Sequence, residues 1–201
     1  MKNILYTIIL SFLLLSCDTT VTTTTADFQA GLDAYQAGDY ATALKEFRSL
    51  AEQGNVDAQY NIGVIYHQVE GVTQDYKKAL KWYRLAAEQG DVRAQHNLGN
   101  MYYRGQGVTQ DYKEAAKWYR LAAEQGLALS QHDLGLLYEK GQGLTENYVI
   151  AHMWFNIAAR DGNEAAKTSK DEAESLMTSE QLVEAQKLAR ECIKKNYKDC
   201  G

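Results

Sequence analysis

The sequence predicts an all-α protein in which helical hairpins stack one on another. One phrase recurs at a spacing of 36 residues, its apolar residues are three or four positions apart, and the 201-residue chain contains no proline. Internal repeats with a period of roughly 20 to 50 residues mark stacked arrays, in which each unit buries its apolar face against its neighbours. The three copies begin at Ala58, Ala94 and Ser130.

Residues 1–16 have the pattern of a signal peptide. Lys2 is followed by an almost unbroken apolar run from Ile4 to Leu15, which is too short to span a bilayer comfortably. The run ends in Leu14-Leu15-Ser16-Cys17, which resembles the bacterial lipobox. We therefore expect lipidation of Cys17, and a plain cleaved signal is the alternative.

Residues 17–27 read as a lipidated, threonine-rich tether without helical periodicity, which would hold the repeats away from the membrane. Asp18 resembles the retention signal of inner-membrane lipoproteins, and a soluble tether residue explains it equally well. Several acyl chains on one cysteine would give stable anchoring. We expect an exported, lipid-anchored protein of the bacterial cell envelope that faces the periplasm, with the inner membrane slightly favoured.

Residues 28–57 form a shortened lead unit, and residues 58–165 form three full repeats. In each repeat the apolar spacing predicts two amphipathic helices, A and B. Short side-chain oxygens that can accept from free backbone amides stand at the expected N-cap of helix B: Asp75, Asp111 and Asn147. Glycines that suit a left-handed residue stand just past its end: Gly90, Gly126 and Gly162.

Helix A carries a glycine at its middle in every repeat: Gly63, Gly99 and Gly135. Glycine there costs about 1 kcal/mol relative to alanine, so a steric reason is needed. We expect helix B to approach closely at these points. The tryptophans at repeat spacing, Trp82, Trp118 and Trp154, are expected to be packing residues rather than ligand platforms.

Residues 166–201 predict C-terminal capping helices and a tail. Ala166 to Met177 would form a more polar helix A, and Thr178 with Gln181 gives a capping-box signature for the last helix. Cys192 and Cys200 remain once Cys17 is set aside. In an exported chain this pair predicts a disulfide that would hold the tail on the last helix, and free thiols are the alternative.

The repeat resembles a known family. Its Leu-Gly-x-x-Tyr phrase, its Gly-x-Gly-Val-x-x-Asp-Tyr loop and its Ala-x-x-Trp-Tyr-x-x-Ala-Ala-x-x-Gly phrase are similar to those of the Sel-1-like repeat, a relative of the tetratricopeptide repeat. The resemblance is strongest over residues 58–165 and looser over residues 28–57. It implies a right-handed α-solenoid that serves as a non-enzymatic adaptor for other proteins, with no shared catalytic residue and no cofactor.

If helices A line the concave face, as in tetratricopeptide relatives, their residues outside the core stripe should bind a partner. These residues change from repeat to repeat while the core positions repeat, which indicates a surface selected for one envelope protein or peptide; an unselected solvated face is the alternative. We expect a monomer. The predicted protein-binding concave face comprises Tyr60, Asn61, Val64, His67, Gln68, His96, Asn97, Asn100, Tyr103, Arg104, His132, Asp133, Leu136, Glu139 and Lys140.

Other classes of function are disfavoured. The net charge is −5 and no basic stripe occurs, which argues against nucleic acid. His96 and His132 share a column, but neighbouring helices pack about 8 to 10 Å apart and no third ligand is in register, so we expect no metal. The glycine pairs at Gly105 and Gly141 follow helices rather than strands, which argues against a dinucleotide loop.

The runner-up function is a weak β-lactam- or peptidoglycan-binding, or β-lactamase-like, envelope protein. A cysteine-rich branch of the same family has been described as penicillin-binding, but that branch carries a cysteine pair in each repeat. The sequence contains no Ser-x-x-Lys, and Lys167-Thr168-Ser169 only faintly resembles the lactamase Lys-Thr-Gly phrase. We therefore expect no enzyme activity.

Overall fold

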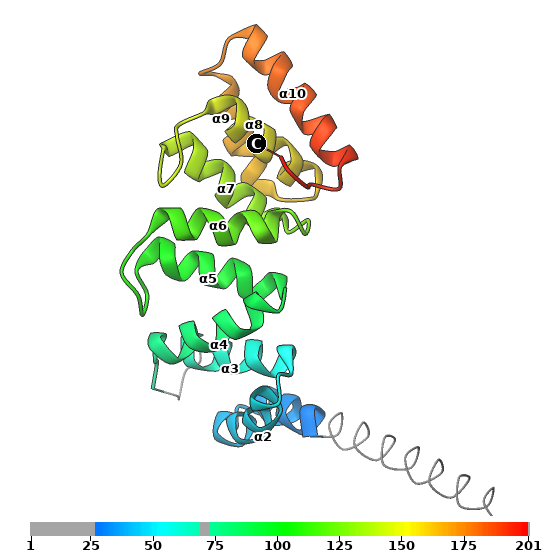
Figure 1. The fold of residues 1–201 in the computed structure, drawn as a ribbon. Helices are drawn as coiled ribbons and strands as arrows, with labels where there is room; N and C mark the ends of the chain where they lie inside the picture. The colour runs from blue at the N-terminus through cyan, green and yellow to red at the C-terminus, as the bar shows by residue number, and fades with distance from the viewer. Residues whose placement is uncertain (1–26, 69–72, 201) are drawn as a thin grey trace, which may run out of the picture. The chain divides into compact units, whose positions relative to one another are not determined.

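The computed structural model of the chain describes residues 27–68 and 73–200 (Figure 1). All regular secondary structure in these ranges is α-helical, as predicted. The chain divides into two compact units, the first ending at Gln74 and the second beginning at Asp75. The predicted signal peptide, the lipidation site Cys17 and Asp18 lie outside the described residues.

The first unit contains a helical segment over residues 27–36, followed by α2 (Tyr40–Glu52) and α3 (Val56–Gln68). Asp39 caps α2 by accepting a hydrogen bond from the Thr42 amide. Gly31 lies against the Phe47 ring, since a Cβ on this glycine would stand 2.5 Å from a ring carbon. The shortened lead unit therefore pairs its two helices through a glycine and an aromatic ring.

The second unit contains seven helices within its described residues: α4 (Tyr76–Glu88), α5 (Val92–Arg104), α6 (Tyr112–Ala123), α7 (Ala128–Lys140), α8 (Tyr148–Arg160), α9 (Glu164–Glu174) and α10 (Ser179–Lys194). From α4 to α9 each helix packs on the next along the chain, and α10 turns back to pack on α8 (Figure 1). The predicted αα-hairpins and the capping helix are thus present. No helix of the described ranges is both long and apolar enough to cross a membrane.

Helix α9 differs from its predicted range. It runs from Glu164 to Glu174 rather than from Ala166 to Met177. It begins earlier because Asn163 is its N-cap and accepts a hydrogen bond from the Ala166 amide. It ends earlier because Thr178 must adopt an extended conformation to form the capping box of α10, and the residues between make the turn.

The predicted helix caps are confirmed. The N-cap side chains of α4, α6 and α8 accept hydrogen bonds from first-turn amides, and the glycines after these helices have φ between +88° and +95°. The caps of helix A were not predicted: Asn55, Asp91 and Asn163 each accept from the amide three residues on. Leu127 stands at the equivalent place before α7 and makes no such bond.

Close approach explains the mid-helix glycines of the second unit. A Cβ on Gly99 would stand 2.6 Å from the Tyr119 ring of α6, and one on Gly135 would stand 2.5 Å from the Phe155 ring of α8. Both distances are impossible for real side chains. The missing side chains therefore let each helix B seat an aromatic ring against its helix A, and this ring also forms the floor of the surface described below.

A buried glutamine ties each hairpin to the preceding helix. Gln59, Gln95 and Gln131 are at most 4% exposed, and their side-chain amides donate to the carbonyls of Ala51, Ala87 and Ala123 respectively. Each bond spans the turn from helix B to the following helix A. These bonds satisfy polar groups that would otherwise be buried without partners, and they fix the angle at which consecutive helices meet.

Candidate protein-binding surface

The predicted concave-face residues fall into two groups, one in each unit. Those of the second unit lie on α5 and α7, and we call them the A-helix polar surface: His96, Asn97, Asn100, Tyr103, Arg104, His132, Asp133, Leu136, Glu139 and Lys140. Those of the first unit lie on α3: Tyr60, Asn61, Val64, His67 and Gln68. Each group is considered within its own unit.

A chain of hydrogen bonds crosses three helices of the second unit. The Tyr119 hydroxyl of α6 donates to Oδ1 of Asn100 on α5 (2.9 Å), and Nδ2 of Asn100 lies 2.9 Å from Nε2 of His96, one turn earlier. Nδ1 of His96 is 2.9 Å from Oγ of Ser130 on α7. Since Asn100 must use its amide nitrogen as the donor, Nε2 of His96 accepts and Nδ1 carries the proton toward Ser130.

Burial keeps the side chains of this hydrogen-bond network uncharged. It lowers the pKa of His96 to about 4, so the imidazole is neutral at physiological pH. Burial also raises the pKa of Tyr119, which stays a hydroxyl. A neutral histidine with a single tautomer is a fixed structural group. The network therefore holds the side chains of α5 and α7 in place instead of supplying a titrating base.

Asp133 lies at the centre of the A-helix polar surface, on α7. Its Oδ2 is 3.7 Å from Nδ1 of His96 and its Oδ1 is 3.8 Å from Nδ1 of His132, distances too long for hydrogen bonds. Burial raises its pKa to about 6, and Arg104 at the end of α5 offsets part of that shift. Within the described parts of the chain, no group donates a hydrogen bond to this carboxylate. It is thus a half-buried acceptor with unused capacity.

The third repeat replaces the amide network by a different arrangement. Leu136 and Phe155 stand where the second repeat has Asn100 and Tyr119. His132 packs its ring 5.6 Å from the Phe155 ring, and its Nε2 is hydrogen-bonded to Oγ of Ser169 on α9 (3.0 Å). The shared frame therefore carries different surface chemistry in neighbouring repeats.

The remaining surface residues of the second unit lie toward the ends of α5 and α7. Tyr103 packs on the Tyr112 ring at 5.3 Å and accepts a hydrogen bond from Gln110 at its carbonyl, so it supports the loop between the helices. Arg104 and Lys140 are exposed. Burial raises the pKa of the Glu139 carboxyl. The charge of Lys140 offsets part of this rise, and the charge of Glu172 adds to it. Among these charged groups, Arg104 acts on the central Asp133 and favours its ionised form.

The α3 group lies on a single helix of the first unit. Asn61 donates its side-chain amide to the Asp57 carbonyl of its own helix (2.8 Å), and the His67 carbonyl accepts from Gln74. Tyr60 and Val64 are half-buried and Gln68 is exposed. Asn61 therefore lacks the bridging role that Asn100 has in the second unit.

Three functional neighbours were missed from the sequence: Tyr119, Ser130 and Ser169. The Tyr119 hydroxyl donates a hydrogen bond to Asn100 and so anchors it. Ser130 replaces an alanine of the other repeats, is fully buried and bonds His96. That replacement was the available signal, because a hydroxyl placed in an alanine column needs a partner.

The arrangement does not favour catalysis. Three side chains follow one another as the acid, base and hydroxyl of a catalytic triad would: Asp133, His132 and Ser169. However, Oδ1 of Asp133 is 3.8 Å from Nδ1 of His132, which is too long for a hydrogen bond between the acid and the base. Ser169 lies inside α9, where backbone amides bond within the helix and cannot form an oxyanion hole. No group of three or more His, Cys, Asp or Glu within the described residues could hold a metal ion.

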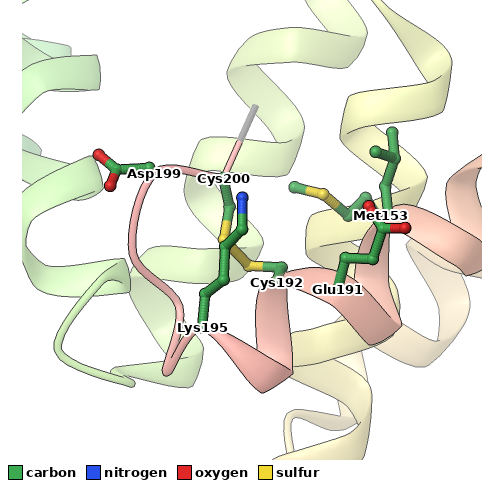
Figure 2. Close-up of a pocket in the computed structure, with 7 residues that line it drawn as sticks. Met153, Glu191, Cys192, Lys195, Asp199 and Cys200 are labelled. Atoms are coloured by element: carbon green, nitrogen blue, oxygen red, sulfur yellow. A yellow bond between two sulfur atoms is a disulfide. The ribbon is translucent and has the colours of Figure 1, made fainter.

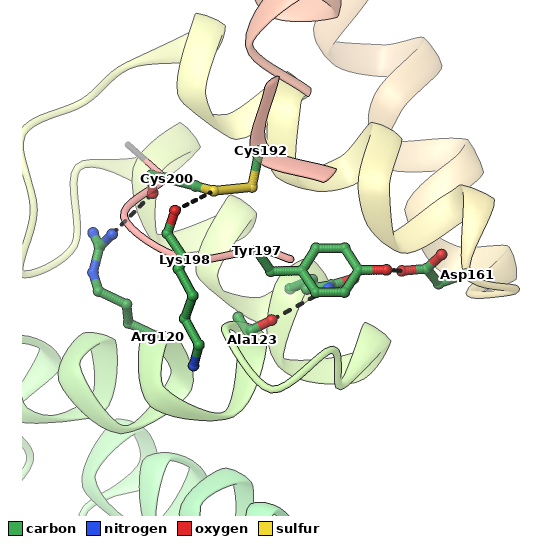
Figure 3. Close-up of a disulfide and its surroundings, with 8 residues drawn as sticks. Arg120, Ala123, Asp161, Cys192, Tyr197, Lys198 and Cys200 are labelled. Atoms are coloured by element: carbon green, nitrogen blue, oxygen red, sulfur yellow. Dashed lines mark hydrogen bonds between the residues drawn. A yellow bond between two sulfur atoms is a disulfide. The ribbon is translucent and has the colours of Figure 1, made fainter. Parts of the chain in front are cut away.

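The C-terminal tail is held by a disulfide and by hydrogen bonds to other helices of the second unit (Figure 3). Cys192 of α10 and Cys200 form a disulfide. The Cys200 carbonyl accepts a hydrogen bond from Nη1 of Arg120 on α6, and the Tyr197 hydroxyl donates to Asp161. Asn196, Tyr197 and Asp199 have φ between +51° and +64°, a strained region for such residues, so the tail is held rather than relaxed.

The chain matches the sequence profile of the Sel1 repeat over residues 56–91, 92–127 and 128–163. These consecutive matches cover more than half of the chain, and the chain belongs to the Sel1 repeat family. The matched units begin two residues before the predicted repeats, at the first residue of each helix A. Proteins of this class generally act as scaffolds for protein–protein interaction. No curated protein matches the chain.

Solved structures are similar to the chain. A Sel1 repeat protein from Oxalobacter formigenes is 37% identical with a TM-score of 0.66, over 71% of this chain and 59% of that one. The protective antigen c5321 of uropathogenic Escherichia coli, which displays an SLR fold, is 31% identical with a TM-score of 0.61, over 88% of this chain and 47% of that one. This chain therefore spans about half to three fifths of their lengths.

A third similar structure is the cysteine-rich protein B of Helicobacter pylori. It is 22% identical with a TM-score of 0.51, over 62% of this chain and 95% of that one. At this identity the likeness concerns the fold alone. Together the three structures confirm the predicted α-solenoid of helical hairpins.

Proposed function

We propose that this chain is a non-enzymatic adaptor, tethered in the bacterial cell envelope, which binds a partner polypeptide on the A-helix polar surface. The partner is an envelope protein or an exposed peptide segment of one. Repeat proteins of this kind build binding surfaces from side chains on a rigid frame. Here Gly99 and Gly135, with the rings they seat, supply the frame.

The observation that carries the proposal is the unused acceptor capacity of Asp133. Its carboxylate is half-buried between two imidazoles and has no hydrogen-bond donor among the described residues. The Asp133 side chain is 27% exposed, so a partner that covers it and excludes water must supply a hydrogen-bond donor in exchange. A lysine or arginine of the partner would supply a donor whose positive charge is opposite to that of the carboxylate. We expect such a side chain to contact Asp133.

The test is site-specific photo-crosslinking in the native cell. A photoreactive residue replaces Arg104, which is exposed at the edge of the surface and outside the hydrogen-bond network. The matched control places the same residue at Lys187, which is exposed on α10. One envelope protein joined to the Arg104 probe and absent from the Lys187 probe supports the proposal. Equal labelling from both positions, or no specific adduct, contradicts it.

Anchoring through Cys17 is a separate part of the proposal. It rests on the lipobox-like sequence before Cys17 and the threonine-rich segment after it. Substitution Cys17→Ala should move the protein from the membrane fraction to the soluble fraction and abolish incorporation of labelled fatty acid. Unchanged membrane association of the variant would overturn the lipid anchor but would leave the binding surface untouched.

A further inference from the structure

A second surface lies on the helices B, away from the A-helix polar surface. On α6 it comprises the residues that we call the B-helix ridge: Lys113, Ala116, Lys117, Arg120, Leu121 and Glu124. Because the repeat period is 36 residues, the same positions can be compared on α2 and α8. The equivalent ridge is covered on α8 and open on α6 and α2.

On α8 the ridge is covered by α10. Met153 and Ile157, which stand where α6 has Lys117 and Leu121, are at most 1% exposed. Met153 borders a small cavity together with Leu188 and Cys192 of α10 (Figure 2). The face that α10 turns inward is a stripe of small and apolar residues at helical spacing: Ala185, Leu188, Ala189 and Cys192. The protein thus contains an example of a helix seated on this ridge.

On α6 the same ridge is open. Its residues and Leu144 of the loop between α7 and α8 surround a shallow hollow of about 480 Å³. Leu121 is 39% exposed and Lys117 is exposed, in contrast to the buried Ile157 and Met153.

The first unit repeats this feature on α2. The equivalent positions Ala41, Leu44, Lys45 and Arg48 surround a hollow of about 340 Å³. A hollow thus occurs at equivalent positions of two helices B, α6 and α2.

The open ridge on α6 is positively charged and partly rigid. Arg120 donates hydrogen bonds to the Tyr138 hydroxyl and to the Cys200 carbonyl, so its position is fixed (Figure 3). Lys117 lies over the Trp118 ring, and Lys113 is exposed. The three cations outnumber the two nearby carboxylates, those of Glu124 and of Glu114, which lies 3.6 Å from Nζ of Lys117. A partner therefore needs acidic residues beside the apolar part that fills the hollow.

We propose that the B-helix ridge of α6 docks an amphipathic helix of a second protein, with a small apolar stripe like that of α10 and acidic residues along its edges. Helix-in-groove binding uses anchors at spacings of three, four and seven residues, which is the spacing of the α10 stripe. This surface is independent of the A-helix polar surface. A scaffold with both could hold two proteins at once.

The test uses a synthetic helix as the probe. The peptide copies residues 179–195 of this chain with Gln186→Glu, Cys192→Ala and Lys195→Glu, and it carries a photoreactive group at the position of Leu188. It is crosslinked to the purified full chain, and the attachment site is found by mass spectrometry. We expect saturable crosslinking to Leu121, Leu144 or their immediate neighbours. A matched peptide with lysine at every glutamate should crosslink at least tenfold less.

Two variants with the same substitution at exposed leucines complete the test. Leu121→Glu should reduce the α6 crosslink at least tenfold, whereas Leu129→Glu, at a residue 55% exposed on α7, should leave it unchanged. Asp133→Asn should also leave it unchanged, which separates this surface from the proposed partner site. Equal crosslinking by Leu121→Glu and the unsubstituted chain, adducts confined to other helices, or no saturable adduct would overturn the proposal.

Discussion

Oδ2 of Asp133 lies 3.7 Å from Nδ1 of His96, yet the two atoms share no hydrogen bond because that nitrogen bonds Ser130. Both groups are removed from water, and burial shifts their pKa values in opposite directions relative to their ordinary values: down to about 4 for His96 and up to about 6 for Asp133. Burial thus favours the neutral form of each group relative to the same group in water. The contributions of these two groups to the stability of the fold therefore depend on pH in opposite directions.

The first prediction concerns the pH dependence of stability. The lowered pKa of His96 makes stability fall as pH falls from 6.5 to about 4, because the unfolded state binds the proton first. The raised pKa of Asp133 makes stability fall as pH rises from 3.8 to about 6, because the folded state keeps the proton longer. The two effects are each at most about 3 kcal/mol and offset one another.

Substitution Asp133→Asn removes only the second effect. The stability of the variant relative to the unsubstituted chain should therefore rise between pH 4 and pH 6, by up to about 3 kcal/mol. Urea unfolding at several pH values measures this difference. Asp171→Asn, at an exposed carboxylate of α9, is the matched control. A flat difference for Asp133→Asn would show that its pKa is not raised.

The second prediction concerns Gly99. Substitution Gly99→Ala gains helix propensity of about 1 kcal/mol but forces the Tyr119 ring to move, and overpacking costs about 1 to 3 kcal/mol. We expect net destabilisation in urea unfolding. In a Tyr119→Ala background the same substitution should become neutral or stabilising. The same cost in both backgrounds would place the steric conflict elsewhere.

The third prediction concerns the tail disulfide. Replacing Cys192 and Cys200 by serine should lower the free energy of unfolding by about 2 to 3 kcal/mol in the chain-entropy model. Hydrogen exchange should accelerate in α10 and the tail, whose left-handed residues relax, while α5 keeps its protection. Reduction of the unsubstituted chain should reproduce the pattern. Uniform acceleration of hydrogen exchange across the second unit would mean that the disulfide stabilises the whole unit and not only α10 and the tail.

The fourth prediction concerns the Tyr119 hydroxyl. Substitution Tyr119→Phe should fit sterically, because Phe155 occupies the same position in the next repeat. The loss of the bond to Asn100 should cost about 1 kcal/mol in urea unfolding. Asn100 and His96 should then change their NMR chemical shifts together. Unchanged stability and shifts would show that the hydroxyl does not anchor the network.

Much of the fold could be predicted from the sequence because the repeat makes each signal recur. Asp75 and Gly90 predicted the two ends of a helix B by cap chemistry, and Gly99 predicted close packing by its cost in a helix. The start of α9 was misplaced because Asn163 was not recognised as a cap. The division of the chain at Gln74 has no sequence signal, since it depends on how many contacts cross that point.

The candidate site was predicted as a set of positions but not as a network. Spacing alone placed His96, Asn100 and Asp133 on exposed faces of helices A. It could not reveal that Asn100 joins Tyr119 to His96, because hydrogen bonds between helices depend on side-chain rotamers and interhelical distance. Nor could it reveal that the Asn61 side chain bonds a backbone carbonyl of its own helix, whereas Asn100 bridges two side chains.

The most direct test of the central claim is partner capture by the Arg104 photo-crosslinking probe in chains with and without Asp133→Asn. This substitution keeps the shape of the side chain and removes the charge that a cationic partner residue would contact. Lys113→Ala, on the B-helix ridge, is the matched control. The account predicts at least a tenfold loss of the adduct with Asp133→Asn and no loss with Lys113→Ala. Equal capture by all three chains would contradict the assignment of the A-helix polar surface as the binding site.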